Sequence, residues 1–212
     1  MSMRTQQNWI DISQPVGPDS GVFAGDTRFR FSWKFDQRRG ASCNVAAVET
    51  SPHVGTHADA PLHYRSDGAS IGEVSLDAYF GPCIVHEGPA SGLIQRSHLR
   101  DIDLTATPRL LLKTHRSREV AFPERFVALS VEAAEYLGAA GCRLIGLDTP
   151  SVDPVASKSL EAHHALGRRG IAILENLLLA DVEPGRYELI ALPLRWVGLD
   201  AAPVRAILRP LG

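Results

Sequence analysis

The sequence predicts an α/β (or α+β) fold built on a mixed sheet, and two features of its pattern carry this prediction. Short apolar runs recur along the whole chain of 212 residues, and two capped helical segments are inserted between them. We expect one domain, residues 1–212, because a core of this size buries enough surface to be stable without disulfides. The pattern does not determine the order of the strands.

Strands are predicted where polar and apolar residues alternate or where apolar residues form short runs. Residues 28–35 alternate strictly, which is typical of a strand with one buried face, and residues 43–50 follow as a second strand. Further strands are predicted over residues 83–86, 109–114, 143–147 and 187–197. Pro203 has no backbone N–H, so we expect the last strand, residues 204–208, to lie at a sheet edge or to begin after a bulge.

Two helices are predicted from their start and stop signals. The first spans residues 131–140 and stops at Gly141, and the second spans residues 160–169 and stops at Gly170. Glycine suits both stops because it readily adopts the left-handed conformation that ends a helix. The candidate N-caps, whose hydroxyl oxygen can accept a hydrogen bond from a free backbone N–H, are Ser130 for the first helix and Ser157 or Ser159 for the second.

The charge balance argues against a nucleic-acid partner or an acidic membrane surface. Lysine and arginine number 22 and aspartate and glutamate 24, whereas those partners need a basic surface. Cys43, Cys83 and Cys142 have no close spacing, so we expect buried thiols in a reducing compartment. The N-terminus has no apolar signal-peptide core, and no run approaches the ~18 apolar residues of a membrane span. A cytoplasmic location is therefore expected.

Histidines gather in one short segment, residues 51–63. Three of the eight histidines in the chain, His53, His57 and His63, lie there together with Asp59. Imidazole and carboxylate ligands suit Zn²⁺, Mn²⁺ or Fe²⁺. Glycine, threonine and proline in the segment disfavour a helix, so we expect a loop that leaves the preceding strand and wraps around one point. His63 could be a further ligand or a neutral imidazole that moves protons beside the metal.

Two further positions could join this cluster. His163 and His164 are successive in the second predicted helix, so they point about 100° apart and at most one faces a given site. From the residues alone, a packed or capped helix histidine is the simpler interpretation. Glu175 lies in the apolar run 171–179, where an unpaired buried carboxylate would be costly and a metal ion would remove the cost. A glutamate that faces the surface is the alternative.

Two groups of residues resemble those of a known family. Residues 51–64 (SPHVGTHADAPLHY) resemble the metal-site signature of the bacterial cyclase-like amidohydrolases. Residues 146–154 (GLDTPSVDP) are similar to one branch of them, the bacterial kynurenine formamidases, and this similarity includes the SK at 157–158, the AHH at 162–164 and the ILE at 173–175. The resemblance covers nearly the whole chain.

The resemblance implies a swivelling β/β/α fold, a homodimer, and a metal-dependent arylformamidase that releases formate from N-formyl-L-kynurenine in tryptophan degradation. It implies a site for two metal ions, expected to be Zn²⁺, with ligands at the matching positions His53, His57, Asp59, His163 and Glu175. It implies that His63 is the proton shuttle. Phe23 stands where the family has a tryptophan against the aryl ring of the substrate, so it keeps stacking but loses the indole N–H.

The chemistry of an aryl formamide sets three requirements. A stable amide needs a nucleophile that exists at neutral pH, a Lewis acid that holds the developing oxyanion, and a proton for the departing nitrogen. A metal centre supplies the first two, and we assign the third to His63. The ligand set contains no sulfur, which suits Zn²⁺ and leaves Mn²⁺ open.

Three other interpretations compete with this one. One alternative is catalysis by a nucleophilic serine, for which the candidates are Ser151 with Asp148 and Asp153. The segment lacks the Gly-x-Ser-x-Gly elbow, so we expect instead a proline-stiffened turn that supports the site from behind the ligands. A second alternative stays open: the chain could be a family member that hydrolyses another aryl or cyclic amide, such as isatin. A metal-carrying binding module without turnover is disfavoured, because a closed structural site needs no spare imidazole. The histidines without a partner at ligand spacing, expected to be surface or packing residues, are His86, His98 and His115.

Overall fold

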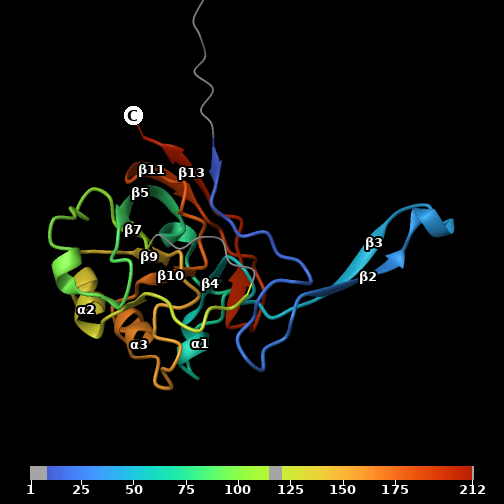
Figure 1. Ribbon diagram of the computed structural model, residues 1–212, viewed down its shortest axis with the longest axis horizontal. Helices are drawn as coiled ribbons and strands as arrows, with labels where there is room; N and C mark the ends of the chain where they lie inside the picture. Colours follow the sequence, from blue (N-terminus) through green and yellow to red (C-terminus); the bar gives the residue numbers. More distant parts are fainter. Residues whose placement is uncertain (1–8, 115–120, 212) are drawn as a thin grey trace, which may run out of the picture.

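The computed structural model describes residues 9–114 and 121–211, and its centre is a nine-stranded mixed sheet (Figure 1). In spatial order the strands are β1 (Ile10–Asp11), β13 (Ile207–Pro210), β11 (Gly185–Ile190), β5 (Phe80–Glu87), β7 (Arg109–Lys113), β9 (Leu144–Leu147), β10 (Ala172–Glu175), β4 (His57–Asp59) and β12 (Ala201–Pro203). Strands β5, β7, β9 and β10 run parallel, and the pairs outside them are antiparallel. The predicted mixed α/β architecture is confirmed.

The centre of the sheet is covered on both faces, which explains the unbroken apolar run of β7. Leu110 and Leu112 pack on one face with the helices α2 (Val131–Ala139) and α3 (Glu161–Arg168). Leu111, between them, belongs to the core on the opposite face. Because side chains alternate along a strand, a strand buried on both faces has apolar residues at every position.

Helix α2 begins and ends where the sequence predicts. The Ser130 hydroxyl oxygen accepts a hydrogen bond from the Ala133 N–H at 3.1 Å, which satisfies one of the free donors of the first turn. Gly141 follows the helix with a φ of +83°, the left-handed conformation expected at a stop. The cap and the stop are local signals, so the prediction did not depend on the tertiary structure.

The ends of two predicted strands are wrong. Strand β11 ends at Ile190, well before the predicted 197, because Pro193 cannot donate to a ladder and the chain turns away there. Of the predicted last strand, residues 204–208, only Ile207 and Leu208 lie in a strand. Pro203 ends the edge strand β12, where a missing N–H is tolerated, while β13 begins only at Ile207 and lies inside the sheet between β1 and β11.

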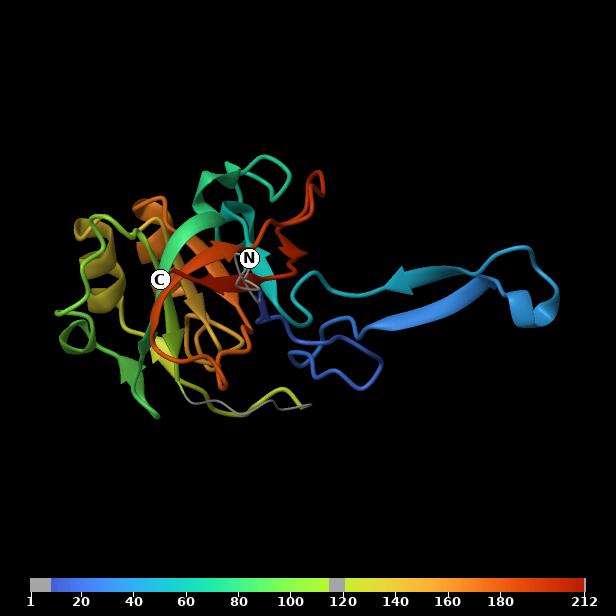
Figure 2. The ribbon, with the colours of Figure 1, turned by 90° about the horizontal axis from the view of Figure 1, so that it is seen from above.

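A two-stranded arm projects away from the sheet (Figure 2). It consists of β2 (Arg30–Phe35), β3 (Val45–Glu49) and, at its tip, the 3-10 turn η1 (Gln37–Arg39). The expectation of a half-buried strand is wrong here, since all six residues of β2 are exposed. The alternation does place Phe31 and Trp33 on one face, before the register of the pair shifts between Trp33 and Phe35, but no described element of this chain reaches far enough to cover that face.

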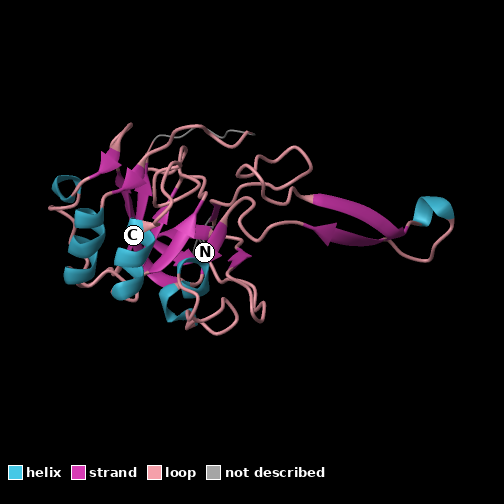
Figure 3. Cartoon of the chain, turned by 90° about the horizontal axis from the view of Figure 1, so that it is seen from below, coloured by secondary structure: helices cyan, strands magenta, loops and turns pink. Residues whose placement is uncertain are grey.

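The remaining elements are short and lie around the sheet (Figure 3). They are a parallel pair, β6 (Leu93–Ile94) and β8 (Ala128–Leu129), the turns η2 (Leu76–Ala78) and η3 (Arg96–His98), and the one-turn helix α1 (Pro61–Tyr64). None of the helices in the described ranges is long and apolar enough to cross a membrane. Cys83 and Cys142 are buried free thiols as expected, but Cys43 is exposed because it lies on the projecting arm.

Candidate metal centre

The centre of the site is the short strand β4, which lies between β10 and β12. The predicted loop does not extend over this whole segment, because both neighbouring strands supply backbone partners for residues 57–59 and β4 forms there. His57 and Asp59 therefore point to one face, and Ala58 enters the core on the other. Glu175 pairs with His57 across the ladder, so its side chain lies on the same face.

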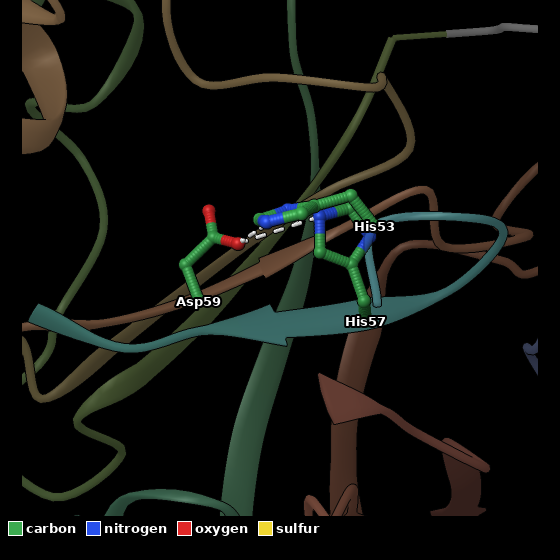
Figure 4. Close-up of side chains that lie close together, drawn as sticks. All are labelled: His53, His57 and Asp59. Atoms are coloured by element: carbon green, nitrogen blue, oxygen red, sulfur yellow. Dashed lines mark ion pairs between the residues drawn. The ribbon is translucent and has the colours of Figure 1, made fainter. Parts of the chain in front are cut away.

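His53 reaches this face from the loop that precedes β4 (Figure 4). Its Nδ1 lies 3.2 Å from Oδ1 of Asp59. Nε2 of His57 lies 3.4 Å from the same carboxylate oxygen and 3.3 Å from Oε2 of Glu175. The Nδ1 of His57 lies 2.9 Å from the Gly55 carbonyl oxygen. A neutral His57 therefore donates its proton to that carbonyl and presents the lone pair of Nε2 to the carboxylates.

His163 approaches from the opposite side, at the start of α3. Asp153 caps this helix, because its carboxylate accepts hydrogen bonds from the backbone N–H groups of Ala162 at 2.9 Å and His163 at 3.0 Å. The predicted cap, Ser157 or Ser159, is wrong; Ser157 instead accepts from Leu160 N–H, before the helix begins. Asp153 also lies 2.6 Å from His163 Nδ1, so Nε2 faces Asp59 Oδ2 at 3.2 Å.

Five side chains that can bind a metal thus lie close together, and two of their buried atoms lack a hydrogen-bond partner. The five residues are His53, His57, Asp59, His163 and Glu175. Within the described chain, Nε2 of His57 and Oδ1 of Asp59 are buried and have no hydrogen-bond partner. A buried polar atom without a partner is costly, and here both atoms face the same small region. Glu175 is also buried, which excludes the surface-facing alternative for that residue. The arrangement fits a bound divalent cation.

The electrostatics of the cluster support the same interpretation. Burial raises the pKa of Asp59, but the adjacent imidazoles of His163, His53 and His57 outweigh it and hold that pKa well below the usual value. Burial lowers the pKa of His57, yet Asp59 and Glu175 raise it to about 10. Without a metal, protons on the imidazoles balance the buried carboxylates. A divalent cation would take over that balance and release the protons.

A cavity of about 380 Å³ opens onto these residues. Its polar lining includes His53, His57, His63 and Glu175. Its apolar wall consists of the rings of Phe23, Phe122 and Phe126. The rings of Phe23 and Phe122 meet edge to face at a centroid distance of 5.7 Å. The cavity therefore joins an aromatic wall to a cluster of metal-ligand type, which suits a substrate with an aryl ring beside its reacting bond.

His63 lies on α1, at the border between the cluster and the cavity. Its ring centroid is 4.4 Å from that of His53 and 5.4 Å from that of His163, and its side chain is 27% exposed. Its Nδ1 lies 3.3 Å from Oδ2 of Asp200. His63 is thus more accessible than the buried members of the cluster, as a group that exchanges protons with a substrate must be.

The loop over residues 148–153 supports the site, as expected for the proline-stiffened turn. Asp148 accepts hydrogen bonds from the backbone and hydroxyl of Thr114, while Asp153 holds His163. Ser151 accepts a hydrogen bond from the backbone N–H of Asp153 and lines the cavity. The imidazole of His163 is thus held by Asp153, and among the described residues no hydrogen bond joins Ser151 to an imidazole base. The loop therefore does not form a serine nucleophile with its base.

The other histidines lie away from the cluster or outside the described residues. His164 is half-buried against Tyr64, with ring centroids 5.8 Å apart, so only one histidine of its pair faces the site. His98 Nδ1 accepts a hydrogen bond from Gln95 N–H and closes η3, and His86 is half-buried in β5. His115 lies outside the described residues.

Sequence reasoning missed several residues of the site. Asp200 was not singled out, because it stands alone after an apolar stretch and is 137 positions from His63. The support expected from the loop that contains Asp153 did not specify its contacts: that Asp153 caps α3 and holds His163 was missed, as were Phe122 and Phe126, because these contacts depend on which loops the fold brings together. An acidic residue shortly before a helix was the one local signal available for Asp153.

Known proteins resemble this chain in sequence and in fold. Residues 10–154 match the family described as "Putative cyclase". The kynurenine formamidase of Bordetella pertussis is 46% identical over 203 residues, which cover 95% of this chain and 97% of that protein. A solved structure described as a potential metal-dependent hydrolase with cyclase activity has a TM-score of 0.84 at 28% identity, and covers 97% of this chain and 98% of its own. Isatin hydrolase A from Labrenzia aggregata, at 22% identity and a TM-score of 0.82, shares the fold over 97% of this chain and 94% of its own.

Proposed function

This chain belongs to the cyclase family, and from that membership we propose that it is a metal-dependent arylformamidase that converts N-formyl-L-kynurenine to L-kynurenine and formate. One observation carries the proposal: a cluster of buried imidazoles and carboxylates, with two orphaned polar atoms, lies at the end of a cavity with an aromatic wall. The 46% identity to a kynurenine formamidase over nearly the whole chain supports it. The reaction would serve tryptophan degradation.

We propose that the cluster holds two Zn²⁺ ions, with Mn²⁺ able to replace them. The residues that would hold them are His53, His57, Asp59, His163 and Glu175. The two oxygens of Asp59 face different imidazoles, Oδ1 toward His53 and His57 and Oδ2 toward His163, so this carboxylate would be able to hold both ions. When bound, such ions supply Lewis-acid activation of water and of the formyl carbonyl.

The protein's own residues supply the rest of the reaction. His63, at the border of the cavity, delivers a proton to the anilide nitrogen as the C–N bond breaks, so that the amine leaves neutral. Asp153 fixes the ring of His163, and the Gly55 carbonyl fixes the ring of His57, so that both rings keep their orientation. Phe23 holds the aryl ring of the substrate from the wall of the cavity.

The proposal is tested by ranking three substrates on the metal-loaded protein. We expect kcat/KM to be highest for N-formyl-L-kynurenine, lower for plain formanilide and lowest for isatin. Phe23→Trp should keep this order and change mainly KM, because stacking on the ring is present in both the ground and the transition state. An isatin rate above the N-formylkynurenine rate would instead assign the chain to cyclic amides. A collapse of kcat with unchanged KM in the variant would show that Phe23 does not simply hold the ring.

We also propose that the protein is a homodimer joined through its arm. The face of the arm that carries Phe31 and Trp33 is exposed, and the centroids of these two rings are 5.9 Å apart. Large exposed apolar patches of this kind mark interaction surfaces. Sedimentation equilibrium should give twice the chain mass of 23.0 kDa, and a monomer would contradict the proposal. The cytoplasmic location expected from the sequence stays a prediction.

A further inference from the structure

Asp200 lies where two parts of the site meet. It immediately precedes the edge strand β12, next to β4 in the sheet. Its backbone carbonyl accepts a hydrogen bond from the Ala60 N–H at 2.8 Å, directly before the helix α1 that carries His63. The backbone of Asp200 is therefore tied to the segment that joins Asp59 to His63, and this fixes where its side chain can reach.

One oxygen of Asp200 contacts two imidazoles. Oδ2 lies 2.8 Å from Nε2 of His53 and 3.3 Å from Nδ1 of His63. A neutral imidazole has one N–H and one lone pair. Because Nδ1 of His53 faces Asp59, a His53 that binds a metal through Nδ1 carries its proton on Nε2 and donates it to Asp200. His63 likewise donates its Nδ1 proton, which leaves Nε2 as its basic nitrogen.

We propose that Asp200 is a positioning residue that fixes the tautomer and orientation of His63 for proton transfer while it holds the outer nitrogen of His53. The inference rests on the proposed function, since it assigns a role toward the proton shuttle of that reaction. Carboxylates that accept the outer N–H of an imidazole in this way commonly fix its tautomer and its orientation.

The same geometry argues against Asp200 as a metal ligand. A cation at Asp200 would need the lone pair of Nε2 of His53, whereas a cation beside Asp59 needs the lone pair of Nδ1. One neutral imidazole cannot supply both. The Asp200 side chain is also 39% exposed, while that of Asp59 is fully buried. A cation would therefore bind on the buried side of His53, next to Asp59, and Asp200 would contact the same imidazole from its outer side.

The test is Asp200→Asn in the zinc-loaded protein, with zinc content, kcat and KM measured separately. We expect kcat for N-formyl-L-kynurenine to fall about 10- to 100-fold, the usual effect of removing such a partner, with zinc content and KM nearly unchanged. Asp200→Glu, which keeps the charge, should recover part of the rate. Asp67→Asn is the matched control, because Asp67 is an exposed carboxylate close to α1 that pairs with Arg65.

A double-mutant cycle separates positioning from a general structural effect. In a His63→Ala background, Asp200→Asn should cause little further loss, because residues that act through one another are not additive. Full additivity, or a rise in KM alone, would each overturn the inference, the second by making Asp200 a substrate contact. If the wild-type protein does not hydrolyse N-formyl-L-kynurenine, the proposed function fails; if it does and Asp200→Asn matches it, only the inference fails.

Discussion

Removal of metal with a chelator is expected to abolish the hydrolysis of N-formyl-L-kynurenine, and Zn²⁺ or Mn²⁺ should restore it. Water is a poor nucleophile at neutral pH, and only a bound metal ion lowers its pKa from 15.7 to about 7. None of the described side chains at the cavity offers an alternative, since Ser151 is not paired with an imidazole base. We therefore expect the rate of hydrolysis by the metal-free protein to fall to the rate of the uncatalysed reaction.

Metal content and activity are measured on the same samples, by elemental analysis and by formate release. Activity should rise with zinc and reach its maximum near two ions per chain. A circular dichroism spectrum of the metal-free protein serves as the control for unfolding, because the buried carboxylates of Asp59 and Glu175 then rely on protonated imidazoles alone. Full turnover in a demonstrably metal-free sample would contradict the proposed mechanism.

His63→Ala should lower kcat by ~10²–10⁴, the usual contribution of general acid–base catalysis, while most of the metal is retained. His63 is partly exposed and contacts Asp200, whereas His57 is buried against Asp59 and Glu175. His57→Ala should therefore lose metal together with activity on every substrate. The difference between the two variants separates a proton shuttle from a ligand.

An activated formate ester sharpens this comparison, because its leaving group departs without a proton. The loss in His63→Ala should be much smaller for the ester than for N-formyl-L-kynurenine. His164→Ala is the matched control, since His164 adjoins His163 but packs on Tyr64 away from the cluster. A His63→Ala variant that loses metal as readily as His57→Ala, or that slows ester and amide equally, would show that His63 is not the proton donor.

Local patterns predicted the elements that depend on neighbouring residues. Ser130 and Gly141 set the ends of α2 because a cap and a stop act within one turn. His57 and Asp59 are two residues apart, so both side chains lie on one face once β4 forms, since side chains alternate along any extended segment. The sequence also indicated that Glu175 needs a partner, because a carboxylate in an apolar run is costly to bury alone.

Two errors show where such patterns fail. The alternation of residues 28–35 identified a strand and its apolar face, but an alternating pattern does not specify what covers that face. In this chain the arm leaves the sheet, so the face is exposed. The cap of α3 was assigned to the nearest serines, whereas Asp153, several residues earlier, accepts the free N–H groups. The path of the loop before α3 determines that Asp153, and not a serine, reaches these N–H groups.

By itself, the sequence determined the types of ligand, the two helices and the mixed sheet, because charge, periodicity and capping are properties of short segments. The family resemblance implied that His163 and Glu175 join the site, but apart from that resemblance only the tertiary structure decided which distant residues share it. It brought His163 and Glu175 to Asp59, and Asp200 to His63, through strand order and loop paths that no local pattern encodes. Contacts between residues more than a hundred positions apart depend on the packing of the whole chain, and the chemistry of this site depends on such contacts.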